Sequence, residues 1–229
     1  MTDGALNSLF SQHCCICNNL LTNADDFICP HCLACVQTAR NGNYVESKVA
    51  KLFWGKTQVC RGASMWTYSK GSHSSKILVE MKYGKRIDIC RKTGRMFAAS
   101  LLDKNFFSDI DVIIPIPLAE ERKRQRGYNQ AEQISLGIHD VTGLPVNTHS
   151  LVRVVNNPSQ TTVAGVSRND NVKDIFSLSE NSCLDNMHIL VVDDILTTGA
   201  TINSAIQEIM KGANNCTFSI LTIGLSDNS

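Results

Sequence analysis

Two adjacent carboxylates stand beside a threonine- and glycine-rich turn in the stretch ILVVDDILTTGAT, from Ile189 to Thr201. The apolar run before Asp193 and Asp194 predicts a buried strand, and the turn after them opens an amphipathic helix. Carboxylates at a strand end accept hydrogen bonds from sugar hydroxyls, while the amides, hydroxyls and dipole at a helix start favour a phosphate. A solvated acid pair and an ordinary helix cap would not also require Thr-Thr-Gly-Ala-Thr. The stretch therefore predicts a site for a sugar phosphate.

A second group of reactive side chains lies near the N-terminus. The chain has ten cysteines, and four of them form two CxxC pairs separated by eleven residues: Cys14, Cys17, Cys29 and Cys32. Two such pairs can hold one Zn²⁺ ion in tetrahedral geometry, and a four-thiolate shell leaves no open position for water. The spacing thus predicts a structural zinc site that serves folding. Three neighbours are close enough in sequence to replace one ligand, and that choice stays open: Cys15, His31 and Cys35.

Length and charge limit the class of protein. With 229 residues, 43% of them hydrophobic, the chain can bury one sizeable core plus a small appendage. No apolar run approaches the roughly 20 residues that span a bilayer, and no signal peptide is recognisable, so we expect a cytoplasmic protein without membrane insertion. Residues 61–130 hold fourteen Lys and Arg against seven Asp and Glu, whereas residues 131–229 hold four against ten. The middle segment should favour anionic partners, although a solvated helix face has the same composition.

Helical and strand periods alternate from residue 72 onward, and these elements must position the acid pair. We expect helices over 73–83, 86–102, 128–141 and 200–211, and strands over 111–117, 188–193 and 218–224. Short Val/Ile runs are typical of strands buried on both faces of a parallel sheet. The pattern predicts an α/β fold, with a parallel sheet flanked by helices and ligands at the carboxyl ends of its strands.

The segment from Arg40 to Tyr68 is expected to be a linker that leads into this body. Within it, AKLFWGKT at 50–57 satisfies a relaxed ATP-binding loop pattern with Ala in place of the first Gly. Phe53 and Trp54 stand where backbone amides would have to approach phosphate, and no apolar strand precedes the loop. These features argue against ATP binding here.

The motifs in their order resemble a known family. The acid pair and its turn resemble the 5-phosphoribosyl pyrophosphate (PRPP) motif of type I phosphoribosyltransferases. Nearly the whole chain resembles the ComF/GntX family of competence-associated, phosphoribosyltransferase-like proteins. That likeness rests on the cysteine pairs, on IPIPLAEERKRQRGYNQA at 114–131, on the pattern from Gln160 to Phe176 that includes Arg168 and Asn171, and on VVDDILTTGAT.

The resemblance implies roles for individual residues. Asp193 and Asp194 would be the catalytic residues and hold the ribose hydroxyls. The 5′-phosphate would be wrapped by Thr197, Thr198, Gly199, Ala200 and Thr201. Pyrophosphate would be received by Pro117, Leu118, Arg122, Arg126 and Lys82, with Mg²⁺ bridging pyrophosphate and ribose oxygens. A mobile loop would carry Gln160, Arg168 and Asn171. Relatives usually have basic residues between the first two, where this chain reads TTVAGVS, which weakens the expectation that this loop supplies a cation.

Two functions follow as hypotheses. The first is a Mg²⁺-dependent phosphoribosyltransferase that releases pyrophosphate and whose acceptor the sequence does not identify. The second is a non-catalytic PRPP-binding module whose zinc knuckle and basic face engage DNA-uptake machinery, such as a helicase, or single-stranded DNA. In either case we expect two units, a zinc knuckle with its linker over 1–60 and a phosphoribosyltransferase-like α/β domain over 61–229.

Overall fold

The structure, a computed structural model, describes residues 12–23, 26–154 and 175–227. The expected mobile-loop residues Gln160, Arg168 and Asn171 lie outside these ranges. In chain order the elements are α1 (Pro30–Ala34), α2 (Lys48–Lys51), β1 (Arg61–Tyr68), α3 (His73–Tyr83), α4 (Ile87–Leu101), the 3-10 turn η2 (Leu102–Lys104), β2 (Val112–Pro115), α5 (Glu120–Arg126), α6 (Gln130–Thr142), β3 (Leu151–Arg153), β4 (Phe176–Leu178), β5 (His188–Leu196), α7 (Ala200–Gly212) and β6 (Thr217–Ser226). Among the described residues, no helix has the length and apolar character needed to cross a membrane.

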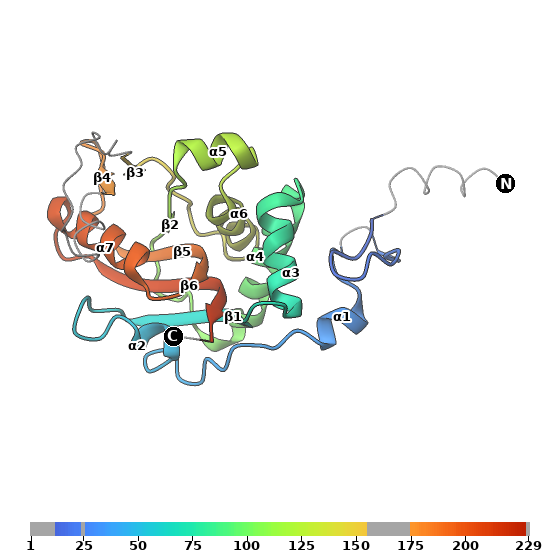
Figure 1. Ribbon diagram of the computed structural model, residues 1–229. Helices are drawn as coiled ribbons and strands as arrows, with labels where there is room; N and C mark the ends of the chain where they lie inside the picture. The colour runs from blue at the N-terminus through green and yellow to red at the C-terminus, as the bar shows by residue number, and fades with distance from the viewer. Residues whose placement is uncertain (1–11, 24–25, 155–174, 228–229) are drawn as a thin grey trace, which may run out of the picture.

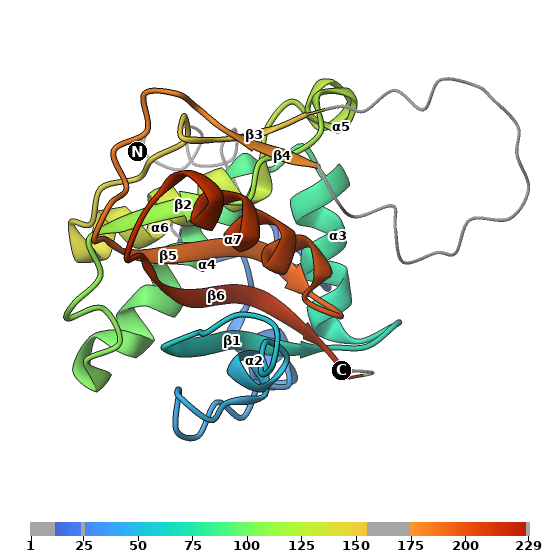
Figure 2. The same ribbon diagram turned by 90° about the vertical axis from the view of Figure 1, so that its left-hand side faces the viewer.

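A four-stranded parallel sheet forms the centre of the molecule, in the order β1-β6-β5-β2 (Figure 2). The central strands carry continuous apolar runs because both of their faces are covered; Ile189 to Val192 of β5 are all buried. A separate antiparallel pair, β3 and β4, sets Arg153 opposite Phe176. The α/β class with a parallel sheet flanked by helices is confirmed.

Helices cover both faces of the sheet and enclose two apolar cores. One core joins α3, α4 and α6 to one face, through residues such as Leu78, Phe97 and Ile134. The other joins α2 and α7 to the opposite face, through residues such as Phe53 and Ile206. Figure 2 shows α7 lying across β5 and β6, with α4 on the far side. Because the four strands are parallel, their carboxyl ends lie at one edge of the sheet, and this edge is flanked by the two helical layers.

The segment expected to be a linker is part of the body. Its last eight residues form the edge strand β1, and Lys48–Lys51 form the short helix α2, which packs against β1 and β6. The side chain of Asn41 bonds both the amide and the carbonyl of Ser64 and so covers part of the free edge of β1. The ATP-loop-like stretch at 50–57 is no phosphate cradle, because Phe53 is fully buried. The linker interpretation failed because β1 is a mixed polar and apolar edge strand without a clear period.

Helices α4 and α6 pack with their backbones unusually close. A side chain at Gly94 would collide with the backbone of Ile134, and one at Gly137 would collide with the backbone of Arg91. Arg91 also forms two hydrogen bonds of 2.7 Å with Asp140 across the same interface. This close contact fixes α6, whose first turn reaches the carboxyl edge of the sheet.

Candidate functional site

A cavity of about 350 Å³ opens at the carboxyl ends of the parallel strands. Many of the expected site residues line it: Lys82, Pro117, Leu118, Arg122, Arg126, Asp193, Asp194, Thr197 and Thr201. They come from α3, the loop after β2, α5, β5 and the start of α7. The other three residues of the turn, Thr198, Gly199 and Ala200, lie outside the lining. The topology thus gathers side chains that are more than one hundred residues apart in sequence.

The acid pair sits at the end of β5, which runs through Leu196 instead of stopping at Asp193. The Asp193 carboxylate accepts a hydrogen bond of 2.8 Å from the amide of Asp194. Asp194 forms an ion pair of 3.0 Å with Lys82 at the last turn of α3. Burial, and then the charge of Asp194, raise the pKa of Asp193 to about 8. One of the two carboxylates is therefore neutralised by a lysine, and the other holds a proton near neutral pH.

The turn from Thr197 to Gly199 leads into α7 and depends on a glycine in the left-handed region. Gly199 has a φ of +76° and is the residue before the first turn of α7. A side chain built on it would meet the ring of Phe53 at 3.0 Å. Phe53 therefore lies directly beneath the turn and supports it. In the sequence, Phe53 argued only against ATP binding; its role under the turn has no local signal, because the contact joins residues almost 150 positions apart.

Basic side chains form one wall of the cavity. Helix α5 contributes Arg122 and Arg126 and has no buried residue. Arg126 donates a hydrogen bond of 2.9 Å to Gln130 and lies over the ring of Tyr83, 5.3 Å from its centroid. The loop between α5 and α6 is fixed by Asn129, which donates to the carbonyl of Ile116 at 3.0 Å. The arginines are thus tied to the loop that follows β2.

The structure adds lining residues that sequence reasoning missed: Tyr68, Ile116, Gln130, Arg153 and Ile195. Tyr68 ends β1, a strand that the sequence did not reveal. Gln130 lies inside the quoted RGYNQA motif but received no role. Arg153 carried no motif of its own, and only the fold of β3 brings it to the cavity. For Gln130 the available signal was its position in the motif.

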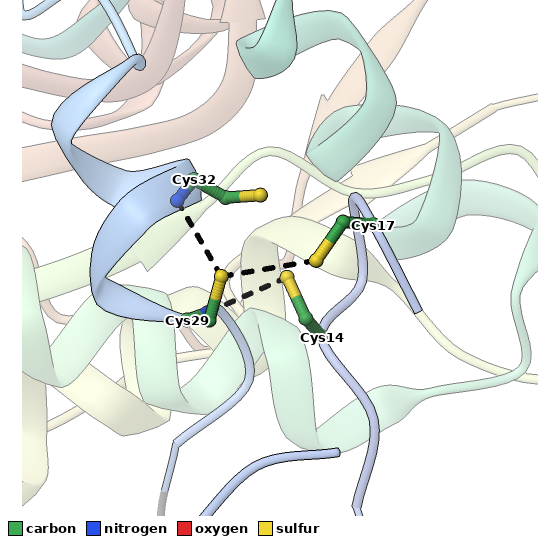
Figure 3. Close-up of side chains that lie close together, drawn as sticks. All are labelled: Cys14, Cys17, Cys29 and Cys32. Carbon is green, nitrogen blue, oxygen red and sulfur yellow. Dashed lines mark hydrogen bonds between the residues drawn. The ribbon is translucent and has the colours of Figure 1, made fainter. Parts of the chain in front are cut away.

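The four predicted cysteines converge at the N-terminal end (Figure 3). Their sulfur atoms all lie within 4.8 Å of one another, and those of Cys17 and Cys29 are 3.8 Å apart. A tetrahedral ion with Zn–S bonds of about 2.3 Å requires sulfur separations of about 3.8 Å. Amides donate to two of the sulfurs, from Cys29 to Cys14 and from Cys32 to Cys29. The cluster therefore fits a tetrahedral metal ion.

The surroundings shift the pKa values of two cluster thiols in opposite directions, since burial and the neighbouring thiols raise the pKa of Cys32. Burial raises the pKa of Cys14, but hydrogen bonds from the amides of Cys17, Cys29 and Ile16 outweigh it and lower the value to about 6. Burial raises the pKa of Cys15 to about 12. The group of four that converges excludes Cys15, His31 and Cys35. The knuckle lies on the α3 side of the body, where the guanidinium of Arg86 donates to the carbonyl of His13 at 3.0 Å (Figure 1).

Comparison with known proteins gives partial matches, and no family model matches the chain. The chain is 33% identical to competence protein F of Haemophilus influenzae over 103 residues. This matched stretch covers 44% of each protein. Over 121 residues it is 32% identical to competence protein ComFC of Bacillus subtilis, covering 53% of this chain and 45% of the relative. The DNA utilization protein YhgH of Salmonella typhi is 24% identical over 140 residues, covering 60% and 61%. The chain thus matches less than half the length of the first two relatives.

Among solved structures, similar chains carry phosphoribosyltransferase names. A purine phosphoribosyltransferase from Pyrococcus horikoshii has a TM-score of 0.38 at 14% identity and covers 60% of this chain and 76% of its own. The adenine phosphoribosyltransferase of Leishmania tarentolae has a TM-score of 0.37 at 12% identity and covers 80% and 89%. The sequence matches to the competence proteins confirm the resemblance that the motifs indicated. Over about half of its length, the chain is therefore similar to the ComF competence proteins.

Proposed function

We propose that the chain binds PRPP with Mg²⁺ and transfers the 5-phosphoribosyl group to an acceptor, releasing pyrophosphate. One observation carries the proposal: a single cavity holds the acid pair, threonines of the turn that opens α7, and four cationic side chains, Lys82, Arg122, Arg126 and Arg153. A ligand that suits such a lining has adjacent hydroxyls in its middle and phosphate groups at both ends. PRPP has this arrangement.

Each group in the cavity has a task in this reaction. The turn at 197–201 binds the 5′-phosphate, and Asp193 and Asp194 accept hydrogen bonds from the ribose hydroxyls. The bond between the ribose C1 and the pyrophosphate oxygen breaks, and its electron pair leaves on the pyrophosphate. The nucleophile supplies the electron pair of the new bond to C1. Positive charge that develops on the sugar ring is favoured by the acid pair, and the leaving group by the arginines.

Two metal ions belong to the proposal. Mg²⁺ bound together with PRPP would supply charge neutralisation for the leaving group. Zn²⁺, held by Cys14, Cys17, Cys29 and Cys32, closes the knuckle and has no open position for catalysis. We also propose a division into a zinc-knuckle unit and an α/β domain, with helix α2 and Phe53, from the segment 1–60 expected to form the knuckle unit, counted with the α/β domain because they pack into its core.

Calorimetry with PRPP at millimolar Mg²⁺ tests the binding step. We expect the wild-type chain to bind, and Asp194→Asn to bind at least about tenfold more weakly, because an ionised acceptor is lost. Asp103→Asn, which removes an exposed carboxylate remote from the cavity lining, is the matched control and should bind as the wild type does. Heat of binding that is absent in the wild type, or unchanged in Asp194→Asn, would refute the site.

Turnover is measured as pyrophosphate release from PRPP with pooled nucleobases and amines. Release that disappears in Asp194→Asn supports the transferase. Tight PRPP binding without release supports a second function, a binding module of a DNA-uptake or other DNA-associated assembly. The observations that favour this module are the competence and DNA-utilization names of the relatives and the exposed basic helix α5. Its DNA binding should be weak and should fade between low and physiological salt.

A further inference from the structure

Arg153 is a cationic residue of the cavity lining that belongs to none of the sequence motifs. It is the last residue of β3 and stands in register with Phe176 of β4. Its guanidinium lies over the Phe176 ring, 5.6 Å from the ring centroid. The aromatic face braces the side chain at the cavity lining, near the acid pair. Arg153 is thus supported by the ring of Phe176, and its guanidinium donates no hydrogen bond to another residue within the described ranges.

The electrostatic setting of Arg153 is unfavourable without a ligand. The side chain is half-buried, and burial followed by the charge of Arg122 lowers its pKa. Asp193 acts in the opposite sense. Across residues 12–23, 26–154 and 175–227, neither Arg122 nor Arg153 forms an ion pair with a carboxylate. Two guanidiniums from different elements therefore face one cavity, neither of them in an ion pair with a carboxylate that the structure describes, and an anion between them would remove their repulsion.

We propose that Arg122 of α5 and Arg153 of β3 form a two-arginine clamp for the pyrophosphate group of the ligand. The inference rests on the proposed function, because the turn at 197–201 takes the 5′-phosphate and leaves the pyrophosphate for the opposite wall. A guanidinium presents a planar fork of donors that fits phosphate oxygens in pairs. Arg153 thereby supplies the cation that the TTVAGVS stretch at 161–167 does not contain.

Separate titrations with inorganic pyrophosphate and with ribose 5-phosphate test the clamp, both at millimolar Mg²⁺. In Arg153→Gln the dissociation constant for pyrophosphate should rise about 10- to 100-fold, because a charge-assisted contact is lost. The constant for ribose 5-phosphate should stay within about twofold of the wild type. Arg153→Lys keeps the charge without the fork and should restore part of the affinity. Arg124→Gln, on the same helix as Arg122 but outside the cavity lining, is the matched control and should change neither constant.

Thermal unfolding of the ligand-free variant separates binding from a structural role. Since burial and the charge of Arg122 act on Arg153 more strongly than the charge of Asp193, and no described carboxylate forms an ion pair with it, Arg153→Gln should melt at the wild-type temperature or above it. A lower melting temperature, or pyrophosphate affinity within twofold of the wild type, would overturn the clamp. An equal loss of ribose 5-phosphate affinity would also count against it. If the wild-type chain binds PRPP and Arg153→Gln binds pyrophosphate equally well, only the clamp fails; if the wild type binds no PRPP, the proposed function fails as well.

Discussion

Replacing Asp193 by Asn should stabilise the ligand-free protein and weaken PRPP binding. The raised pKa of Asp193, about 8 against the ordinary 3.8, means that the folded state binds a proton more tightly than the unfolded state does. Between these two values the unfolded chain has lost this proton and the folded chain keeps it, so stability falls as pH rises. The stability that this proton gives to the folded state is fully present below about pH 4 and fully lost above about pH 8.

The magnitude follows from the shift. One pKa unit corresponds to about 1.4 kcal/mol, so the full shift amounts to on the order of 5 kcal/mol. The charge of Lys82 and water that enters the site lower the free-energy cost of ionising the carboxylate. We therefore expect the free energy of unfolding of Asp193→Asn to exceed that of the wild type by about 1–3 kcal/mol at pH 8. The Asn side chain keeps the oxygen that accepts from the amide of Asp194, so the local geometry is preserved.

Urea unfolding of the wild type and Asp193→Asn at several pH values from 5 to 9 measures the effect. The stability difference should be smallest at pH 5 and should grow until about pH 8. The matched variant Asp103→Asn alters an exposed carboxylate and should give no pH-dependent difference. Above pH 8, where the wild-type carboxylate is ionised, PRPP affinity of Asp193→Asn should fall at least about tenfold, because a ribose acceptor loses its charge. A stability difference that stays constant with pH, or an Asn variant that is less stable at pH 8, would refute the assignment of a buried, protonated Asp193.

Three further predictions concern the zinc site, the phosphate turn and the helix interface. Cys17→Ser should reduce bound zinc to well below one equivalent in metal analysis, whereas Cys35→Ser should keep about one equivalent, because Cys35 lies outside the group of four; equal zinc in both would contradict the ligand set. Gly199→Ala should weaken PRPP binding about fivefold or more in calorimetry, because the left-handed backbone costs about 1 kcal/mol or more and the new methyl meets Phe53; unchanged affinity would argue against the turn as the phosphate site. Gly137→Ala should lower the free energy of unfolding by about 1–3 kcal/mol in urea, with PRPP affinity affected less than stability, because helices α4 and α6 must move apart; a neutral variant would exclude this tight packing.

The sequence predicted the elements whose periods are clear. Helix α3 begins and ends at the expected residues, and α4 and α7 agree to within a residue or two. The strand ends differ more, since β5 continues through Leu196 and β6 extends from Thr217 to Ser226. Helix α5 received no prediction because its sequence, EERKRQR, is polar on every side and gives no hydrophobic period. Strand β1 was missed for a related reason, since it lies at an edge and carries polar and apolar residues in irregular order.

By itself, the sequence determined the chemistry of functional residues that are close together in the chain. The acid doublet, the turn at 197–201 and the two CxxC pairs are each contained in a short stretch, so their residue types and spacing are sufficient to predict a sugar-phosphate site and a metal knuckle. Tertiary structure alone decided which distant side chains complete the site. Lys82 meets Asp194, Phe53 supports Gly199 and Arg153 reaches the cavity only because parallel strands end at one edge between two packed layers. Such contacts depend on the strand order and on buried packing, neither of which has a local signature in the chain.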